Sequence, residues 1–592
     1  MNKTPHSLLF LWRRPLLLLL LLFLCCASVC VAQKDGGDAP STGVVRELPR
    51  KGQSGMQAYT VATQENEKWE PIRIKAFTRD LEDKSKYCTE VNQKIVSFFG
   101  NVVKCFEADD LNDERHREYI NEIIPAAIKL HEERLRVQPH KGKIIVPELE
   151  GDYCENFTVP EEHRTEGVDA DFVFYVAAVP WHYTFGLTCA TEESSGRPIV
   201  GVMNFIPSLY GGLRLNVRRA AHEMAHALGF NVIDMGEKNM LSHVIIRGNN
   251  RTVVSSELTK KKAQEHYDCP DLEGVELTLR DEAHWLQRVA KDELMAAPRE
   301  SGAGYYTALT MSTFEGLGYY RANWGMEEPM SWGHKGGCNF LKETCTENEK
   351  HYSEQFCNDT TALRCTSDRT AYGMWYRGQQ REYQGPNDVC HVIGSFVKGN
   401  DNVKTYTYCT GAETNALPGS LMGPDSWCLD GEGLQVQNAG ESVESLSGVC
   451  ARVSCDERRR TVSVQYKGSD TFKECPEGTS IDVESSAFQS GGKIKCPKYD
   501  EVCTIALNGS SLVPFVNPHQ PSAVGATLIN GKDNANTNDP SKYPGVVNQA
   551  QINNMQNSTG ILTELAKDNA FSAVYSFPIM IVTMVLAVVL SC

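Results

Sequence analysis

Residues 222–230 read His-Glu-Met-Ala-His-Ala-Leu-Gly-Phe, and the rest of the chain can be interpreted from this stretch. On a helix, His222 and His226 lie four residues apart and project from one face, where two imidazole nitrogens can share one Zn²⁺ ion. Glu223 follows the first histidine directly, so its carboxylate can take a proton from a water held by the metal. The preceding residues favour a helix, and Gly229 is suited to end it. The stretch predicts the active-site helix of a zinc hydrolase.

Length and composition describe a large globular protein. The 592 residues are enough for two to four domains, and the hydrophobic and charged fractions of 41% and 23% are ordinary for folded chains. The formal net charge of −16 argues against nucleic-acid binding, which needs clustered lysine and arginine. We therefore expect no nucleic-acid partner.

The N-terminus predicts the secretory pathway. Residues 1–32 carry a basic start, an apolar core of about a dozen residues at 15–26, and a small-residue cleavage site at Ala32, which together resemble a signal peptide. That apolar core is too short to span a membrane. The chain therefore enters an oxidising compartment, where its cysteines are expected to pair. Glycosylation sequons consistent with this route stand at Asn156, Asn250, Asn358, Asn508 and Asn557.

The C-terminus predicts a lipid anchor. An apolar run at 571–590 is long enough to span a membrane, but no lysine or arginine follows it. Small residues, a polar spacer and this apolar tail, in that order over 557–592, are typical of a glycosylphosphatidylinositol (GPI) anchor signal. Asn557 is the attachment candidate, with Asn569 and Ser572 as alternatives. We expect the protein at the outer leaflet of the plasma membrane, with a single-pass tail or a shed form as the alternatives.

Hydrophobic patterning predicts an α+β arrangement before the histidine stretch. Residues 33–65 are polar and are expected to form a pro-segment or flexible lead-in. The elements expected after them are a strand at 72–77, a helix at 120–135 that Pro125 kinks or starts, and buried strands at 171–179 and 198–205. The second half of the chain is richer in cysteine than the first, because twelve of the seventeen cysteines from Cys88 to Cys503 stand at or after Cys338. A disulfide-rich, loop-rich C-terminal region is expected there.

Two histidines leave a catalytic zinc ion one protein ligand short. The compact metzincin pattern would place the third histidine three residues after Gly229, but Val232 stands there. The ligand must therefore come from further along the chain, and spacing alone does not select it. The candidates are His243, His266, His284 and, in a gluzincin-like arrangement, Glu257.

Further segments make the sequence resemble the leishmanolysin family of kinetoplastid surface metalloproteases. The likeness runs from about Trp69 to Cys503. It includes 222–230 with a histidine after a long insertion, Asp-Glu-Leu-Met at 292–295, Gly-Tyr-Tyr-Thr-Ala-Leu-Thr-Met at 304–311, Val-Gly-Val at 200–202, and Gly-Leu-Gly-Tyr-Tyr at 316–320.

This resemblance implies the complete site. His284 would be the third zinc ligand after a 54-residue insertion at 230–283, and Met295 would supply the Met-turn below one Zn²⁺ per chain. Glu223 would act as the general base. The strand around residues 201–204 would line the cleft and pair with substrate backbone, as in metzincins generally. The implied function is a cell-surface endopeptidase acting on extracellular or host proteins, with an accessory role in cell adhesion.

The resemblance also implies a domain layout. The N-terminal domain would be metzincin-like, the central domain mixed, and the C-terminal domain mostly β-strand and loop. The expected divisions are a signal peptide at 1–32, a pro-segment at 33–65, a catalytic domain at 66–230, a central domain with the third ligand and Met-turn at 231–343, a Cys-rich domain at 344–510, a stalk at 511–556 and the anchor signal at 557–592.

Eight disulfides are implied in the same way, and they leave one cysteine over. Cys357 lacks its family partner, so we expect a free thiol there or a disulfide-linked partner protein. The implied pairs are Cys88–Cys105, Cys154–Cys189, Cys269–Cys338, Cys345–Cys390, Cys365–Cys428, Cys409–Cys450, Cys455–Cys503 and Cys475–Cys496.

Latency departs from the family pattern. A zymogen of this family is expected to cap its zinc with a pro-segment cysteine, but residues 33–87 contain neither cysteine nor histidine. Thiolate coordination from that segment is therefore excluded.

Two other interpretations compete with the peptidase. A catalytically silent, GPI-anchored adhesin could keep the same fold, but it would have no chemical reason to retain Glu223. A gluzincin would use Glu257 as its third ligand, and zinc binding that survived loss of His284 would favour it.

Overall fold

The computed structural model describes residues 68–515, except positions 99, 107–108, 152, 181–183, 208–211, 280, 298–301, 358, 360, 378–389, 399–403, 412–416, 438–442 and 490. They belong to one compact unit, which begins at Lys68. The expected signal peptide, pro-segment and anchor signal lie outside the described residues, as do Asn358, Asn557 and nearly all of the stalk. Among the described helices, none has the length and apolar character that crossing a membrane requires.

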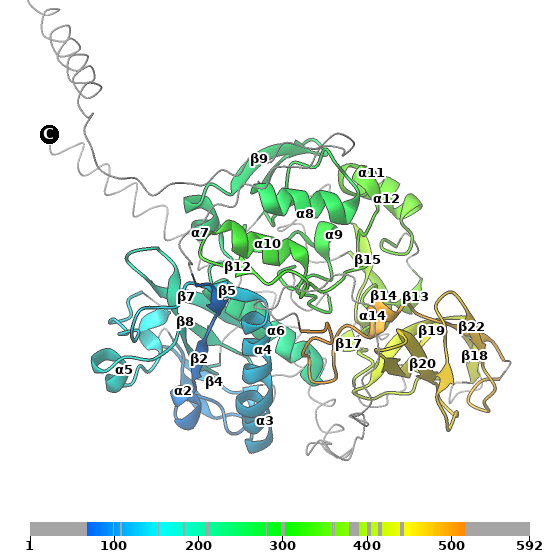
Figure 1. Ribbon diagram of the computed structural model, residues 1–592. Helices are drawn as coiled ribbons and strands as arrows, with labels where there is room; N and C mark the ends of the chain where they lie inside the picture. Colours follow the sequence, from blue (N-terminus) through cyan, green and yellow to red (C-terminus); the bar gives the residue numbers. More distant parts are fainter. Residues whose placement is uncertain are drawn as a thin grey trace, which may run out of the picture. The chain divides into compact units, whose positions relative to one another are not determined.

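A four-stranded sheet forms the centre of the N-terminal part (Figure 1). Strands β2 (Ile74–Phe77), β6 (Phe172–Ala177) and β8 (Pro198–Asn204) are parallel, and β7 (Phe185–Thr191) runs antiparallel to β8 at the edge. Alternate residues of β6 pack into two different hydrophobic cores. Strands buried on both faces have continuous apolar sequences, which is why 171–179 and 198–205 could be predicted.

The strand expected to pair with substrate was assigned wrongly. Residues 201–204 lie in β8, whose two sides are occupied by β6 and β7. The edge strand next to β8 is β7. The sequence did not predict this strand because its half-exposed Phe-Gly-Leu-Thr-Cys-Ala-Thr pattern lacks a clear period. An apolar run predicts a buried strand, but it does not give the strand's position in the sheet.

The predicted helix at 120–135 is confirmed, but its first turn is wider than expected. Helix α4 spans Ile124–Glu132, and the π-helical turn η2 covers Tyr119–Ile123. Pro125 lies in the first turn of α4, where its missing N–H is tolerated. In the turn before it, the Ile124 N–H reaches the Tyr119 carbonyl, five residues back.

Helix α6 (Gly212–Ala227) carries the histidine stretch and packs on this sheet and on α4. Two glycines allow the close approach. A Cβ atom at Gly186 of β7 would lie 1.9 Å from the Glu223 carbonyl oxygen, and one at Gly201 of β8 would lie 2.9 Å from the Ala227 Cβ. Gly229 follows α6 with a φ of 106°, as the predicted helix end requires.

The long insertion after α6 forms its own three-stranded sheet and two helices. Helix α7 (Val232–Glu237) leads into a sheet ordered β11-β10-β9, formed by β9 (Leu241–Ile246), β10 (Asn249–Val254) and β11 (Val275–Glu276). Helix α8 (Glu257–Tyr267) lies between β10 and β11 in the chain. This insertion ends at the loop that carries His284.

Short elements complete the N-terminal and central parts. They are β1 (Glu70–Pro71), α2 (Arg79–Glu82), β3 (Lys94–Val96), β4 (Val102–Lys104), α3 (Asp113–Glu118), β5 (Leu135–Val137), η3 (Cys154–Asn156), α5 (Glu161–Thr165), α9 (Gln287–Ala290), α10 (Ala308–Gly316), β12 (Arg321–Ala322), α11 (Gly337–Lys342) and α12 (Cys345–His351). The sheet β1-β5-β12 joins strands from both parts, and α10 packs against α8.

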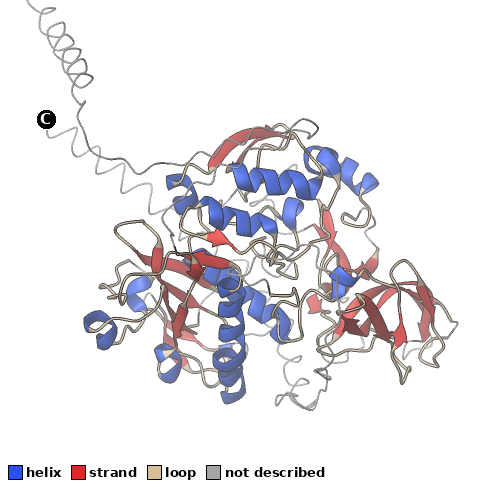
Figure 2. Cartoon of the chain, in the orientation of Figure 1, coloured by secondary structure: helices blue, strands red, loops and turns tan. Residues whose placement is uncertain are grey.

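The C-terminal region is rich in β-strands, as predicted (Figure 2). A six-stranded sheet is ordered β21-β20-β19-β18-β23-β22. Its strands are β18 (Ser426–Gln437), β19 (Val443–Asp456), β20 (Thr461–Gln465), β21 (Lys473–Glu474), β22 (Ser480–Asp482) and β23 (Lys493–Lys495). Around it lie β13 (Leu363–Cys365), β14 (Tyr372–Arg377), β15 (His391–Ile393), β16 (Phe396–Lys398), β17 (Lys404–Tyr406) and α14 (Tyr499–Val502).

All eight implied disulfides are formed. They join Cys88 to Cys105, Cys154 to Cys189, Cys269 to Cys338, Cys345 to Cys390, Cys365 to Cys428, Cys409 to Cys450, Cys455 to Cys503 and Cys475 to Cys496. Among the described cysteines, Cys357 is free, which confirms that prediction. Its side chain is buried, so an intermolecular bridge would require this sulfur to reach the surface.

Candidate metal centre

Three histidines from two distant segments meet at one point. The Nε2 atoms of His222 and His226, both on α6, are 3.1 Å apart. The Nε2 atom of His284, from the loop after β11, lies 3.2 Å from each of them. The structure therefore brings together the three residues that the sequence and the family resemblance had predicted as ligands.

The other ring nitrogens fix the tautomer of each histidine. The Nδ1 atoms of His222 and His226 face the carbonyl oxygens of Leu294 and Phe230 at 2.6 and 2.8 Å, and the Nδ1 atom of His284 faces the Asp281 carboxylate at 3.1 Å. Because carbonyl and carboxylate oxygens only accept, each Nδ1 carries the proton. The three Nε2 lone pairs then point at one another, an arrangement suited to a cation between them.

The size of the histidine triangle fits one small metal ion. An ion bonded tetrahedrally at about 2.0–2.1 Å from each imidazole nitrogen sets those nitrogens about 3.3–3.4 Å apart. The Nε2 separations of 3.1–3.2 Å are close to that value. Three neutral imidazoles with a fourth position left for water are a donor set typical of catalytic zinc.

A short turn between Thr278 and His284 positions the His284 ring at the site. The Thr278 N–H donates to the His284 carbonyl oxygen at 3.0 Å, and Trp285 pairs with Leu277 in an antiparallel bridge. Within the turn, Asp281 accepts hydrogen bonds from His284, from the Thr278 hydroxyl and from the Ala283 N–H. Burial opposes ionisation of Asp281, but the electrostatic attraction of the His284 ring and the hydrogen bonds from these three partners outweigh it and hold the pKa of this carboxyl well below its usual range.

The predicted Met-turn lies against the first histidine. Met295 is fully buried, and the residue before it, Leu294, supplies the carbonyl that accepts from His222. The Met295 carbonyl also accepts from Trp285 N–H at 2.8 Å, which ties the turn to the loop of His284. The turn thus contacts both chain segments that supply histidines.

Glu293, which the sequence analysis did not single out, holds this turn in shape. Its carboxylate accepts from the Met295 N–H at 2.6 Å and from the Thr307 hydroxyl at 2.9 Å. Burial raises the pKa of Glu293 to about 7, against the opposing effect of these hydrogen bonds.

The sequence analysis did not single out Asp281 either. Its position three residues before a candidate histidine could have indicated its role. The carbonyl groups of Leu294 and Phe230 could not have been found in this way, because every residue has a backbone carbonyl.

Glu223 is 1% exposed and follows the first histidine directly on α6. The alternative ligands lie elsewhere. Glu257 begins α8 with a 91% exposed side chain paired with Lys260, and His243 faces Thr252 at 3.3 Å. The ring of His266 contacts the Trp332 carbonyl at 2.9 Å, and burial lowers the pKa of this histidine to about 4. None of the three shares a donor cluster with His222 and His226 among the described residues.

Three of the predicted glycosylation sites can be placed. Asn250 on β10 and Asn508 in a late turn are exposed, and Asn156 at the end of η3 is partly exposed. Each position is accessible to modification, and their occupancy stays a prediction.

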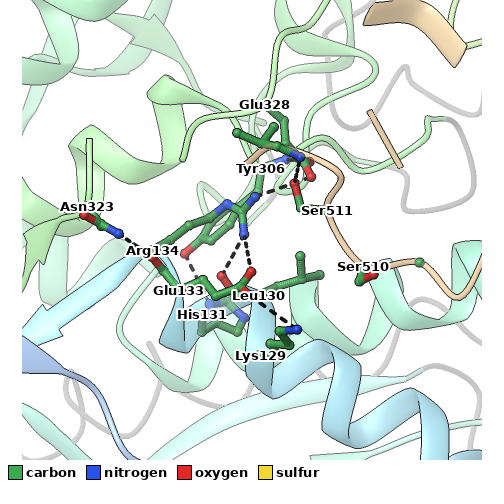
Figure 3. A network of polar contacts seen from close by, with 12 residues as sticks. Lys129, Leu130, His131, Glu133, Arg134, Tyr306, Asn323, Glu328, Ser510 and Ser511 are labelled. Carbon is green, nitrogen blue, oxygen red and sulfur yellow. Dashed lines mark hydrogen bonds and ion pairs between the residues drawn. The ribbon is translucent and has the colours of Figure 1, made fainter. Parts of the chain in front are cut away.

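A buried polar network around Arg134 and Glu328 (Figure 3) reaches α6 through Arg218. Arg218 of α6, one turn before His222, pairs with Glu328 through two contacts of 2.5 and 3.0 Å. Arg134 contacts the same carboxylate at 3.4 Å, and the Tyr306 N–H donates to it at 2.8 Å. Next to this network, the His131 ring contacts the Ala221 carbonyl, directly before His222, at 2.9 Å.

Comparison with known proteins agrees with this centre. A family model described as leishmanolysin matches residues 26–509. The chain is 36% identical to the leishmanolysin of Leishmania major over 470 residues, which is 74% of this chain and 76% of that protein. It is 34% identical to a leishmanolysin homolog of Crithidia fasciculata over 75% of this chain and 72% of that protein, and 24% identical to a leishmanolysin-like peptidase of Drosophila melanogaster over 64% and 71%. The chain therefore belongs to the leishmanolysin family and is a metalloendopeptidase.

Proposed function

We propose that this protein is a cell-surface zinc endopeptidase in which His222, His226 and His284 hold one Zn²⁺ ion. The observation that carries the proposal is the convergence of three Nε2 atoms within 3.2 Å, each on a ring whose Nδ1 faces an acceptor. Such a set binds a cation that prefers neutral imidazole, and zinc is the usual choice. Met295 would form the structural turn beside the ion.

Glu223 is the general base of the proposed reaction. A bound zinc ion supplies Lewis acidity, which acidifies water and polarises the scissile carbonyl. The Glu223 carboxylate takes the proton from the attacking water and then delivers it to the departing amine. Leu294, Phe230 and Asp281 accept the Nδ1 protons of the three histidines, which leaves each Nε2 atom available to the ion.

Strand β7 is the proposed binding edge for an extended substrate segment. It is the outer strand of its sheet, and Gly186 within it touches the backbone of Glu223. A peptide added along this edge would gain backbone hydrogen bonds and bring its scissile bond beside the general base. The substrates would therefore be unfolded or extended segments of extracellular or host proteins.

We also propose the domain layout that the family resemblance implies and the membrane anchor that the C-terminal sequence predicts. A metzincin-type catalytic domain at 66–230 would be completed by the central domain at 231–343, because His284 and Met295 come from the latter. The Cys-rich domain at 344–510, the stalk at 511–556 and a GPI anchor at Asn557 would present the enzyme outside the cell, where adhesion is an accessory role.

The test compares zinc content and cleavage of a denatured protein by the purified full-length enzyme. We expect about one zinc per chain, and activity that a chelator abolishes. Glu223→Gln should keep its zinc and lose about 10²–10⁴-fold in kcat, since only the proton-transfer group is removed. Glu237→Gln, an exposed glutamate of α7, is the matched control and should cleave normally. Absence of zinc or of cleavage in the wild type would contradict the proposal and favour the silent adhesin, whereas undiminished cleavage by Glu223→Gln would remove Glu223 from the mechanism.

A further inference from the structure

The three histidines of the metal centre differ in what holds their Nδ1 protons. His222 and His226 donate to neutral backbone carbonyls of Leu294 and Phe230, which no side-chain substitution removes. His284 donates instead to a carboxylate oxygen, Oδ2 of Asp281, at 3.1 Å. His284, which follows the long insertion in the sequence, is therefore the ligand that a side chain orients.

Asp281 is itself fixed by its other oxygen. The Oδ1 atom accepts from the Thr278 hydroxyl and from the Ala283 N–H, the latter at 3.2 Å. These two donors leave Oδ2 directed at His284. The carboxylate thus links the start and the end of the turn to the imidazole ring in one defined orientation.

The neighbouring acid, Glu282, faces a different partner. Its backbone has a φ of 48°, in the left-handed region that non-glycine residues seldom adopt, and its carboxylate accepts from the Thr252 hydroxyl at 2.6 Å. Thr252 belongs to β10 of the insertion sheet. These consecutive acids therefore have separate contacts: Glu282 attaches the turn to β10, and Asp281 orients the histidine.

We propose that Asp281 is a positioning residue that keeps His284 in its metal-binding tautomer. By holding the proton on Nδ1, it leaves the Nε2 lone pair directed at the Nε2 atoms of His222 and His226. Carboxylates that hold the second nitrogen of a ligating histidine fix the ring's tautomer and orientation and strengthen it as a ligand. The inference rests on the proposed function, because it assumes that these histidines bind zinc.

Asp281→Asn is the sharpest test because it changes the tautomer while keeping the shape. The Ala283 N–H and the Thr278 hydroxyl would keep the asparagine oxygen in the place of Oδ1. The amide NH₂ would then face Nδ1 of His284 and donate to it, so the histidine proton would move to Nε2. We expect zinc affinity, measured by competition with a chelating dye, to fall by about 10–100-fold. Asp281→Ala, which imposes no tautomer, should lose less.

A second readout separates positioning from general damage to the fold. In the metal-free protein labelled with ¹⁵N-histidine, the His284 nitrogen shifts should report a protonated Nε2 in Asp281→Asn and a protonated Nδ1 in the wild type. The metal-free Asp281→Asn variant should still melt in one cooperative transition, because asparagine keeps the shape of the side chain and both hydrogen bonds to its oxygen.

Glu282→Gln is the matched control, since it removes the same charge one residue away. Its zinc affinity should stay within about twofold of the wild type, because its side chain does not contact His284 directly. An equal loss in Glu282→Gln and Asp281→Asn would overturn the proposal in favour of a simple charge effect. Unchanged zinc affinity in Asp281→Asn would overturn it too, while a wild type without zinc would remove the proposed function itself.

Discussion

Gly186 has the least space for a side chain among the glycines around the candidate site. A Cβ atom there would lie 1.9 Å from the carbonyl oxygen of Glu223 and 2.5 Å from its carbonyl carbon. Since both are backbone atoms inside α6, neither can move without displacing the helix that carries two of the three histidines. Strand β7 and α6 are therefore held at a separation that only glycine permits.

Gly186→Ala should consequently destabilise the protein by about 1–3 kcal/mol, the range for overpacking a tight interior. Zinc affinity should fall with it, because the helix must shift. The measurement is the melting temperature together with zinc competition. Gly236→Ala in α7 is the control, since a Cβ atom there meets nothing within 4 Å. It should be neutral or slightly stabilising. Equal melting temperatures for the two variants would show that the contact is unimportant.

For single residues, the sequence predicts which side chains take part in the site better than it predicts the contacts that position them. The spacing of His222, Glu223 and His226 was sufficient by itself, because four residues on a helix return to the same face. His284 could be selected only through the family resemblance, since a folded insertion separates it from α6. The acceptors at Leu294 and Phe230 were unpredictable, because every residue has a backbone carbonyl and only the fold decides which one faces a ring.

Glu118, at the end of α3, lies between two further acids on the same helical face. Glu114 and Glu122 are four residues before and after it, a spacing at which like charges repel. Burial, followed by the charges of Glu122 and Glu114, raises the pKa of Glu118 to about 7 from 4.5. The folded state therefore binds this proton more tightly than the unfolded chain does. It loses stability as the pH rises from about 4.5 to 7, and the full penalty applies above pH 7.

Glu118→Gln should remove that penalty. We expect a gain of about 1–2 kcal/mol at pH 8 and almost none near pH 4, where wild-type Glu118 is mostly protonated in both states. Melting curves at the two pH values measure it. Glu354→Gln, at an exposed loop position, is the control and should change neither curve. If the gain at pH 4 matched the gain at pH 8, packing rather than charge would explain it.

Elements whose two faces are both buried were predicted well, and elements at boundaries were not. Strands β6 and β8 have continuous apolar sequences because both of their faces meet a core. Strand β7 has mixed burial and was missed, although it forms the edge beside Glu223. The π-helical turn before Pro125 could not be predicted from the sequence either, because the composition of such a turn resembles that of any helix.

At the scale of the whole molecule, the C-terminal end of the described chain returns to the active-site helix. The Gly509 carbonyl accepts from Nε of Arg218, 291 residues away in sequence, at 2.7 Å. Arg218 also pairs with Glu328, the carboxylate of the network in Figure 3. Leu512 N–H bonds to the Thr504 carbonyl, which closes the returning loop on itself. No local pattern could have predicted this contact, because its members share neither a period nor a motif.

This contact predicts that the C-terminal loop stabilises the catalytic part. A Cβ atom at Gly509 would lie 2.5 Å from the Val217 Cβ and 2.8 Å from the Arg214 carbonyl, both in α6. Gly509→Ala should therefore push the loop off the helix. Gly478→Ala is the matched control, because its φ of 77° equals the 78° of Gly509 within a degree while its Cβ meets nothing within 4 Å.

Both variants carry the same cost of about 1 kcal/mol for alanine in the left-handed region, so their difference isolates the contact with α6. We expect Gly509→Ala to melt several degrees below Gly478→Ala and to be cut faster by an added protease within residues 504–512. Its zinc affinity should also be lower, because Arg218 stands one turn before His222 on the same helix. Matching melting temperatures and cleavage rates would mean that α6 is held by the sheet and the Glu328 network alone.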